Sequence, residues 1–306
     1  MKVLKDRIAG ALYGVAIGDA LGAPLEFMDR GEIARKHGRV TEMIGGGWLN
    51  VAPGEITDDT QMTLAVAEGI IANPENPIQE IGARFIEWAK SGPKDIGGTC
   101  NRSIYEAAAR SQQKAPGEEK WFEASKHTSK VNGGRSGGNG ALMRTVYPGL
   151  YYKEPLMAVE TAGAIAQMTH WDKESVEACN LYTEMIHLII GAVNDEEAWQ
   201  LAEKTLKGSQ YKLEPRKGVG PTGYVVDSFK CALHSLAVTK TFEDAIVEAA
   251  NLGGDADTIA AITGGLAGAI YGYKEIPERW IQALDPKTRA QLDRLVDAAV
   301  KNREDE

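Results

Sequence analysis

The sequence predicts an all-α protein. Apolar residues recur at three- and four-residue spacing along most of the chain, and the alternating pattern of strands is nearly absent. Only GYVVDSF, at 223–229, is a weak strand candidate. A hydrophobic content of 43% and a charged content of 25% are ordinary for a globular protein and sufficient for a substantial core.

A first helix is expected over 5–19. Its basic start and apolar middle resemble a signal peptide, but Asp19 interrupts the segment and no cleavage site is evident. TLAVAEGIIA, at 63–72, has helical spacing and is ended by NPENP, and IQEIGARFIEWAK, at 78–90, repeats the pattern. The same criteria predict helices near 102–111, 139–151, 155–168, 174–192, 195–207, 222–236, 242–250, 257–272, 277–282 and 286–301.

The chain is expected to form one domain, 1–306. No Pro- or Ser-rich linker divides it, and no repeat of fixed period appears. The segments 91–101, 112–138 and 208–221 are predicted to be long loops, and long loops on a helical scaffold often carry function.

Composition excludes several classes of protein. A net charge of −9 argues against nonspecific binding to nucleic acid or to anionic membranes. The uncharged run at 258–273 is too short and too rich in Gly and Thr to span a bilayer. The three cysteines, Cys100, Cys179 and Cys231, form no CxxC pair, so a reduced cytoplasmic setting is expected.

Two acidic clusters stand at predicted helix starts. GEITDDTQM contains Thr57, Asp58 and Asp59, and NLGGDADT contains Asp255, Asp257 and Thr258. Such residues can simply cap helices, because their oxygens accept hydrogen bonds from free N–H groups. Taken together they also form an all-oxygen set of the kind that Mg²⁺ or Mn²⁺ requires, and metal ions would neutralise carboxylates that otherwise repel one another. The residues alone leave both interpretations open.

Two further segments are ambiguous when taken alone. In GDALGAPLEFM, Asp19 and Glu26 flank a Gly-Ala-Pro turn, and the simplest interpretation is that both are solvated loop charges. NGGRSGGNGALMR, at 132–144, is either a flexible loop or a phosphate site, because glycines allow backbone N–H groups to approach an anion at the start of a helix near Asn139. It matches neither the Walker pattern nor the dinucleotide-binding pattern.

Four segments together resemble the ADP-ribosylglycohydrolase family: GALYGVAIGDALGAPLEF, GEITDDTQM, SGGNGALMR and NLGGDADTIAAITGGLAGAIYG. The resemblance extends from about residue 8 to about residue 290. EMIGGGWLNVAPGEITDD, SGPKDIGGTCNRS and TGYVVDSF are similar to the dinitrogenase reductase-activating branch, which removes ADP-ribose from an arginine of nitrogenase reductase.

The resemblance implies an all-helical domain with two Mg²⁺ or Mn²⁺ ions. The implied metal ligands are Thr57, Asp58, Asp59, Asp255, Asp257 and Thr258. Glu26 is implied beside the metals, in place of the solvated-loop interpretation, and Asp95 matches a carboxylate implicated in catalysis. The implied substrate-binding residues are Ser136, Gly137, Gly138 and Asn139 for the diphosphate, Tyr224 for the adenosine and His170 in the same pocket.

Without the resemblance, His170, Tyr224 and Asp95 would be taken for a helix-end histidine, a core aromatic and a cap. The other histidines are given no role: His37, His127, His187 and His234. The chain departs from its relatives in WDKE after His170 and in a longer, more basic segment before the glycine-rich loop, where a protein substrate could dock.

The expected function is therefore cleavage of the bond between ribose C1″ and a guanidinium nitrogen of a mono-ADP-ribosylated protein. Nitrogenase reductase and a regulatory protein are candidate partners, and a monomer is expected by resemblance. Alternatives are hydrolysis of another ADP-ribose linkage (serine, a nucleic-acid end or a small metabolite), a non-catalytic ADP-ribose-binding protein, and a metal-dependent phosphohydrolase.

Overall fold

The computed structural model describes residues 2–110, 116–216, 218 and 220–305, and within these ranges it is helical without a β-sheet. Its α-helices are α1 (Lys2–Gly22), α2 (Arg30–His37), α3 (Asp58–Ala72), α4 (Ile78–Lys90), α5 (Gly98–Arg110), α6 (Glu118–Val131), α7 (Val146–Tyr151), α8 (Pro155–Gln167), α9 (Lys173–Ile190), α10 (Asp195–Thr205), α11 (Val225–Ala237), α12 (Phe242–Ala250), α13 (Ala256–Tyr271), α14 (Glu278–Ala283) and α15 (Pro286–Glu304). Three short 3₁₀ helices join them: η1 (Ala23–Leu25), η2 (Leu142–Arg144) and η3 (Tyr273–Glu275). The all-α prediction is confirmed.

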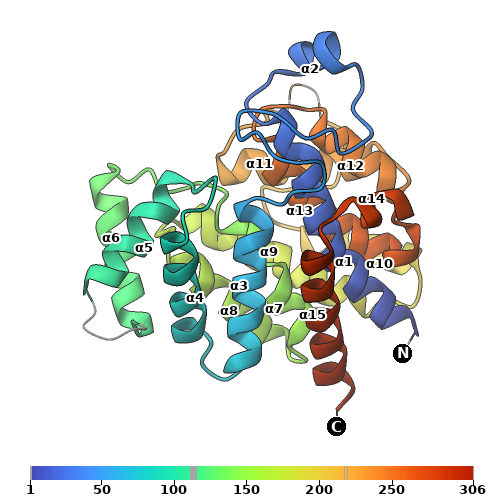
Figure 1. Ribbon diagram of the computed structural model, residues 1–306. Helices are drawn as coiled ribbons and strands as arrows, with labels where there is room; N and C mark the ends of the chain where they lie inside the picture. Colours follow the sequence, from blue (N-terminus) through green and yellow to red (C-terminus); the bar gives the residue numbers. More distant parts are fainter. Residues whose placement is uncertain (1, 111–115, 217, 219, 306) are drawn as a thin grey trace.

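The helices α1 and α13 form the centre of the fold (Figure 1). Glycines on α1 face glycines and alanines on α13, and an added Cβ would overlap the opposite backbone at Gly10, Gly14, Gly18, Gly22, Gly264 and Gly268. Small residues at four-residue spacing therefore let the two backbones touch. This contact fixes the C-terminal end of α1 beside the N-terminal end of α13, where the second acidic cluster begins.

One buried hydrophobic cluster runs from Ile8 to Ala299 and includes side chains from all the helices named above. The core is therefore continuous across these helices. The segment Val3–Leu25 is long and apolar enough to cross a membrane by composition, but the window that meets this criterion is 100% buried inside the protein. It is the central helix of the core.

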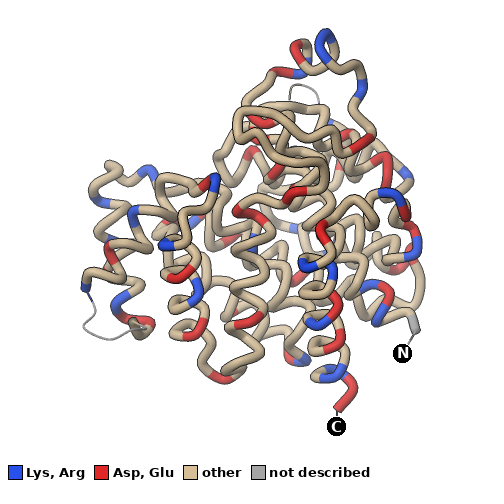
Figure 2. Tube along the Cα trace, viewed as in Figure 1, with Lys and Arg blue, Asp and Glu red and all other residues tan. Residues whose placement is uncertain are grey.

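Charged residues lie mainly on the outer helices. In Figure 2, Lys and Arg segments alternate with Asp and Glu segments along the described chain, and no continuous basic face is seen in this view. The mixture agrees with the acidic net charge.

Several predicted elements differ from the structure. The predicted helix 139–151 is instead a turn, the 3₁₀ helix η2 and the short α7, because Pro148 has no N–H and fits only within the first turn of a helix. The predicted strand candidate contains the start of α11, and its Tyr224 forms only an isolated bridge with Gly138.

Two helices were not predicted. The segment 112–138 contains α6, and α2 lies in a segment to which no element was assigned. The helix predicted over 102–111 begins earlier, at Gly98, which shortens the predicted loop 91–101. Residues 111–115, 217 and 219, which belong to the predicted helix 102–111 and the predicted loops 112–138 and 208–221, lie outside the described residues, as do residues 1 and 306 of the expected domain.

Candidate active site

The two acidic clusters meet at the start of α3 and the start of α13. Thr258 donates a hydrogen bond from Oγ1 to Asp59 Oδ2 at 3.3 Å, although 199 residues separate them. Thr57 Oγ1 donates to the same oxygen, also at 3.3 Å. Asp58, Asp59 and Asp257 are all buried.

Capping of their own helices does not account for these clusters. Thr57 and Asp255 occupy the N-cap positions of α3 and α13, yet neither side chain makes a capping hydrogen bond. Asp19, on α1, performs this task for α3. Its carboxylate accepts hydrogen bonds from the backbone N–H groups of Thr57 and Thr60, at 3.0 and 3.1 Å, and from both hydroxyls.

The solvated-loop interpretation of Asp19 is therefore wrong, because this carboxylate is fully buried within α1. The same interpretation of Glu26 is also wrong, since Glu26 is only 6% exposed. Its carboxylate oxygen lies with oxygens of Asp255 and Asp257, all within 4.8 Å of one another. This agrees with the expectation, from family resemblance, that Glu26 lies beside the acidic clusters.

A divalent metal fits this donor set. Asp59 Oδ1 is buried and has no hydrogen-bond partner among the described residues, and such an orphaned carboxylate oxygen is costly unless a cation or donor compensates it. The surrounding donors are carboxylates and hydroxyls, which suit Mg²⁺ or Mn²⁺. The acidic cluster is thus a candidate metal centre.

The pKa values of the cluster show the same need for positive charge. Burial, followed by the nearby carboxylates of Asp255 and Asp95, raises the pKa of Glu26 to about 8. Burial raises the pKa of Asp19 to about 6, although its threonine hydrogen bonds oppose the shift. Burial and neighbouring carboxylates also raise the pKa values of Asp58, Asp59 and Asp257 well above the ordinary range.

These raised pKa values predict how stability depends on pH. Without metal, the carboxyls stabilise the folded state fully below about pH 4, and this stabilisation is lost as the pH rises through about 6 for Asp19 and about 8 for Glu26. The metal-free protein should therefore gain melting temperature on acidification from pH 8 to 6, measured by calorimetry.

Mg²⁺ or Mn²⁺ should reverse this trend at pH 8. An ion at about 100 times its Kd adds roughly 2.7 kcal/mol, or about 5 °C in a protein of this size. A melting temperature that is insensitive both to the metal and to acidification would contradict the cluster's assignment as a metal centre.

The acidic cluster opens into a cleft of 260 Å³. Of the predicted site residues, the cleft is lined by Glu26, Asp58, Asp95, Gly138, Asn139, His170, Asp255 and Thr258. Thr57 and Asp59 lie behind this surface in the hydrogen-bond network already described, and Asp257 accepts a hydrogen bond there from the Thr258 backbone N–H at 2.9 Å. The cleft also contains Phe27, Gly97, Gly98, Thr99, Cys100, Gly140, Met143 and Gly223, which sequence reasoning did not assign.

The glycine-rich loop forms another wall of this cleft. Gly138 pairs with Tyr224, and a Cβ on Gly137 would lie 3.0 Å from the Tyr224 ring. Ser136 Oγ is buried without a hydrogen-bond partner. The loop thus has the tight backbone and a free hydroxyl that suit an anion, although no α-helix begins at Asn139.

Asn139 contacts the acidic cluster directly. Its side-chain amide donates to Asp255 Oδ2 at 2.8 Å and to Ser228 Oγ at 2.9 Å. The residue thereby couples the glycine-rich loop to the start of α13. Ser228 carried no signal in the sequence, because a serine within a helix has many ordinary explanations.

His170 is held in one orientation by a buried chain of hydrogen bonds. Arg144 donates to Thr169 Oγ1 at 2.6 Å, and the Thr169 hydroxyl is hydrogen-bonded to His170 Nδ1 at 2.8 Å. The other ring nitrogen, Nε2, faces Gly138. Burial, with a smaller contribution from Arg144, lowers the pKa of His170 to about 3, so the imidazole is neutral at physiological pH.

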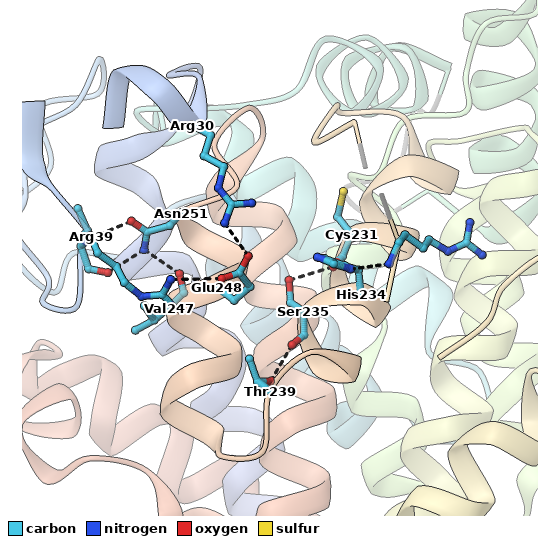
Figure 3. A network of polar contacts seen from close by, with 11 residues as sticks. Arg30, Arg39, Cys231, His234, Ser235, Thr239, Val247, Glu248 and Asn251 are labelled. Atoms are coloured by element: carbon cyan, nitrogen blue, oxygen red, sulfur yellow. Dashed lines mark hydrogen bonds and ion pairs between the residues drawn. The ribbon is translucent and has the colours of Figure 1, made fainter. Parts of the chain in front are cut away.

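A polar network outside the cleft anchors the loop after Glu26 (Figure 3). Arg30 and Arg39 each bind one oxygen of Glu248, on α12, at 3.1 and 3.4 Å. Asn251 accepts from the Val40 N–H and donates to the Val40 carbonyl, at 2.9 and 2.8 Å. These contacts fix the segment 28–40 against the chain that leads into the second acidic cluster.

The fold and the site define an all-helical protein with a carboxylate-rich candidate metal centre beside a glycine-rich anion loop. The sequence profile of the ADP-ribosylglycohydrolase family matches residues 1–306. The chain belongs to the ADP-ribosylglycohydrolase family, and this membership supports hydrolase activity.

Individual relatives agree with this assignment. The ADP-ribosyl-[dinitrogen reductase] glycohydrolase of Rhodospirillum rubrum is 37% identical over 295 residues, which cover 96% of this chain and 95% of that protein. The ADP-ribosylarginine hydrolase Tri1 of Serratia proteamaculans is 30% identical, covering 93% of this chain and 76% of the relative. A solved structure named an ADP-ribosylglycohydrolase-related protein complex has a TM-score of 0.80 and 28% identity, covering 99% of this chain and 100% of that one.

Proposed function

We propose that the protein is a metal-dependent hydrolase that removes mono-ADP-ribose from a modified arginine of a protein. The observation that carries this proposal is the meeting of the two Asp-Thr clusters, with the unpaired Asp59 Oδ1 between them. Two relatives whose names specify ADP-ribosylarginine or ADP-ribosylated dinitrogen reductase support the arginine linkage.

The proposed metal ligands are Thr57, Asp58, Asp59, Asp255, Asp257 and Thr258. Two bound Mg²⁺ or Mn²⁺ ions would supply positive charge for the ribose hydroxyls and for a water molecule. The diphosphate is assigned to the backbone of Ser136–Asn139 and the free Ser136 hydroxyl. The adenosine is assigned to Tyr224, whose ring is 40% exposed.

The reaction requires one water molecule. Its oxygen forms a bond to C1″ while the bond from C1″ to the guanidinium nitrogen breaks, and the electron pair leaves with the guanidine. A carboxylate, Asp95 or Glu26, takes a proton from the water, and the departing guanidine recovers one proton. His170 is neutral, and its Nε2, which faces Gly138 in the cleft, positions the substrate through a hydrogen bond. Binding of the remote diphosphate holds the ribose in reactive geometry.

The setting proposed for this activity is the cytoplasm. All three cysteines are free and buried, which fits a reducing compartment. The substrate partner is a mono-ADP-ribosylated protein, for which the nitrogenase reductase of a relative is one example.

The test is release of ADP-ribose from a protein mono-ADP-ribosylated on arginine, with Mn²⁺ or Mg²⁺ and with excess chelator. Metal-dependent release supports the proposal. Release from serine-linked or nucleic-acid-linked substrates alone would assign another linkage, and release of inorganic phosphate would indicate a phosphohydrolase. Binding of ADP-ribose without any cleavage would indicate a non-catalytic binding protein.

A further inference from the structure

Two large aromatic side chains are exposed at the edge of the cleft. Phe27 is 69% exposed and Trp48 is 53% exposed. Their ring centroids are 5.3 Å apart, with an interplanar angle of 42°. Phe27 lines the cleft next to Glu26, so this aromatic pair adjoins the reacting groups rather than a distant surface.

The backbone holds the aromatic pair in place at a conformational cost. Phe27 has a φ of 63°, which is unfavourable for a bulky residue. Its N–H donates to the Gly254 carbonyl at 2.6 Å, directly before Asp255. Trp48 follows Gly45, Gly46 and Gly47, which all have positive φ values, and a Cβ on Gly47 would lie 2.8 Å from Pro24 Cα in η1.

Trp48 is also tied to the acidic cluster. Its indole Nε1–H donates to Glu26 Oε2 at 2.6 Å. One exposed ring thus fixes the orientation of a buried carboxylate and contacts the Phe27 ring. A tryptophan that only faced solvent would not require the unfavourable φ of Phe27 or the three positive-φ glycines before Trp48.

The aromatic pair lies at the carboxylate end of the cleft. Asp95 is close enough to influence Glu26 electrostatically, and both are near Asp58. The groups proposed for the diphosphate and adenosine, around Gly138 and Tyr224, form a separate wall. Phe27, whose ring contacts Trp48, forms the wall of the cleft at this carboxylate end.

We propose that Phe27 and Trp48 form the subsite for the arginine side chain that carries ADP-ribose. This inference rests on the proposed function. A guanidinium is planar, cationic and weakly hydrated, so it stacks on aromatic faces and pairs with carboxylates such as Glu26 and Asp95. The alkyl stem of the arginine covers the exposed ring surface. A serine-linked substrate has no cation and gains little from this subsite, so the pair favours arginine linkages.

The test uses three variants and a matched control. Phe27→Ala removes one ring without touching the Glu26 hydrogen bond, Trp48→Phe keeps a ring but removes the Nε1–H, and Trp48→Ala removes both. Leu156→Ala is the control, because Leu156 is equally exposed, at 67%, and lines no part of the cleft. For each, kcat/KM is measured on one peptide carrying ADP-ribose on arginine and on its serine-linked counterpart, and the Kd for ADP-ribose is measured by calorimetry.

Phe27→Ala should lower kcat/KM for the arginine-linked peptide about tenfold, mainly through KM, and leave the Kd for ADP-ribose within about twofold. Trp48→Phe should act mainly on kcat, because it releases Glu26. Trp48→Ala should impair both kcat and KM. Activity on the serine-linked peptide, where measurable, should change much less with Phe27→Ala.

Three results would overturn the inference. One is a kcat/KM of Phe27→Ala on the arginine-linked peptide that equals that of the Leu156→Ala control and of the wild type. Another is a loss of ADP-ribose affinity as large as the loss in kcat/KM, which would place the rings against the nucleotide. The third is a wild-type protein inactive on arginine linkages, which would refute the proposed function itself and is recognised without any variant.

Discussion

Asp59→Asn is expected to lower metal-dependent hydrolysis about a thousandfold. The substitution keeps the size of the side chain but removes its charge and replaces one of its two oxygens with an NH₂ group. The pair of oxygens that could bind a metal, one of which is the unpaired Oδ1, is then lost. Because loss of a group that only orients a metal ligand already costs 10- to 100-fold, loss of a ligand itself should cost more. The measurements are kcat/KM with Mn²⁺ and the affinity for Mn²⁺ by calorimetry.

Unfolding would not explain this loss. Burial and neighbouring carboxylates raise the pKa of Asp59, so its removal should maintain or increase the stability of the metal-free protein. Asp257→Asn should behave in the same way. Asp297→Asn is a suitable control, since its side chain is 68% exposed on α15 and pairs with the surface Lys5. Full activity and unchanged Mn²⁺ affinity in Asp59→Asn would refute the metal assignment.

Gly14→Ala is expected to destabilise the fold by about 3 kcal/mol or more. An added Cβ would overlap the Gly264 carbonyl, and neither helix can yield without separating α1 from α13. Gly264→Ala should have a similar effect, because its Cβ would meet the carbonyl of Gly14. Denaturant unfolding of the metal-free proteins measures both changes.

The same substitution should also weaken metal binding. The helix α1 carries Asp19 and leads to Glu26, while α13 carries Asp257 in its first turn, so a shift between the helices displaces the proposed ligands. Gly117→Ala provides the control, because Gly117 precedes α6 with open space around it and a φ of −70°. If Gly14→Ala were as stable as Gly117→Ala, the close contact would not be essential.

The sequence indicated the oxygen-rich residues of the candidate site, but not the residues that surround and orient them. The Asp-Thr motifs were recognisable because carboxylates and hydroxyls at two predicted helix starts are an unusual oxygen-rich combination. The glycines after Asp257 allow tight packing, since Gly264 and Gly268 contact α1 and Gly265 contacts Tyr182. The roles of Asp95, Tyr224 and the glycine-rich loop in binding and catalysis stay predictions.

The structure was needed wherever a partner came from a distant segment. Asp19 looked like a loop charge because its partners, Thr57 and Thr60, are 38 and 41 residues away. The orientation of His170 depends on Arg144 and Thr169, and an arginine after an apolar run does not reveal such a chain of hydrogen bonds. Trp48 gave no signal either, since its contact with Glu26 depends on the path of a glycine loop.

By itself, then, the sequence determined the all-α class and most helix positions, and it indicated oxygen-rich side chains at two helix starts, because these depend on local periodicity and on residue chemistry. Only the tertiary structure decided that the two acidic clusters face each other, that α6 is helical and that the helix expected at Asn139 does not form. The physical reason is that these features depend on burial and on long-range contacts, such as that between α1 and α13. The free energy of such contacts exceeds the intrinsic conformational preference of a short segment.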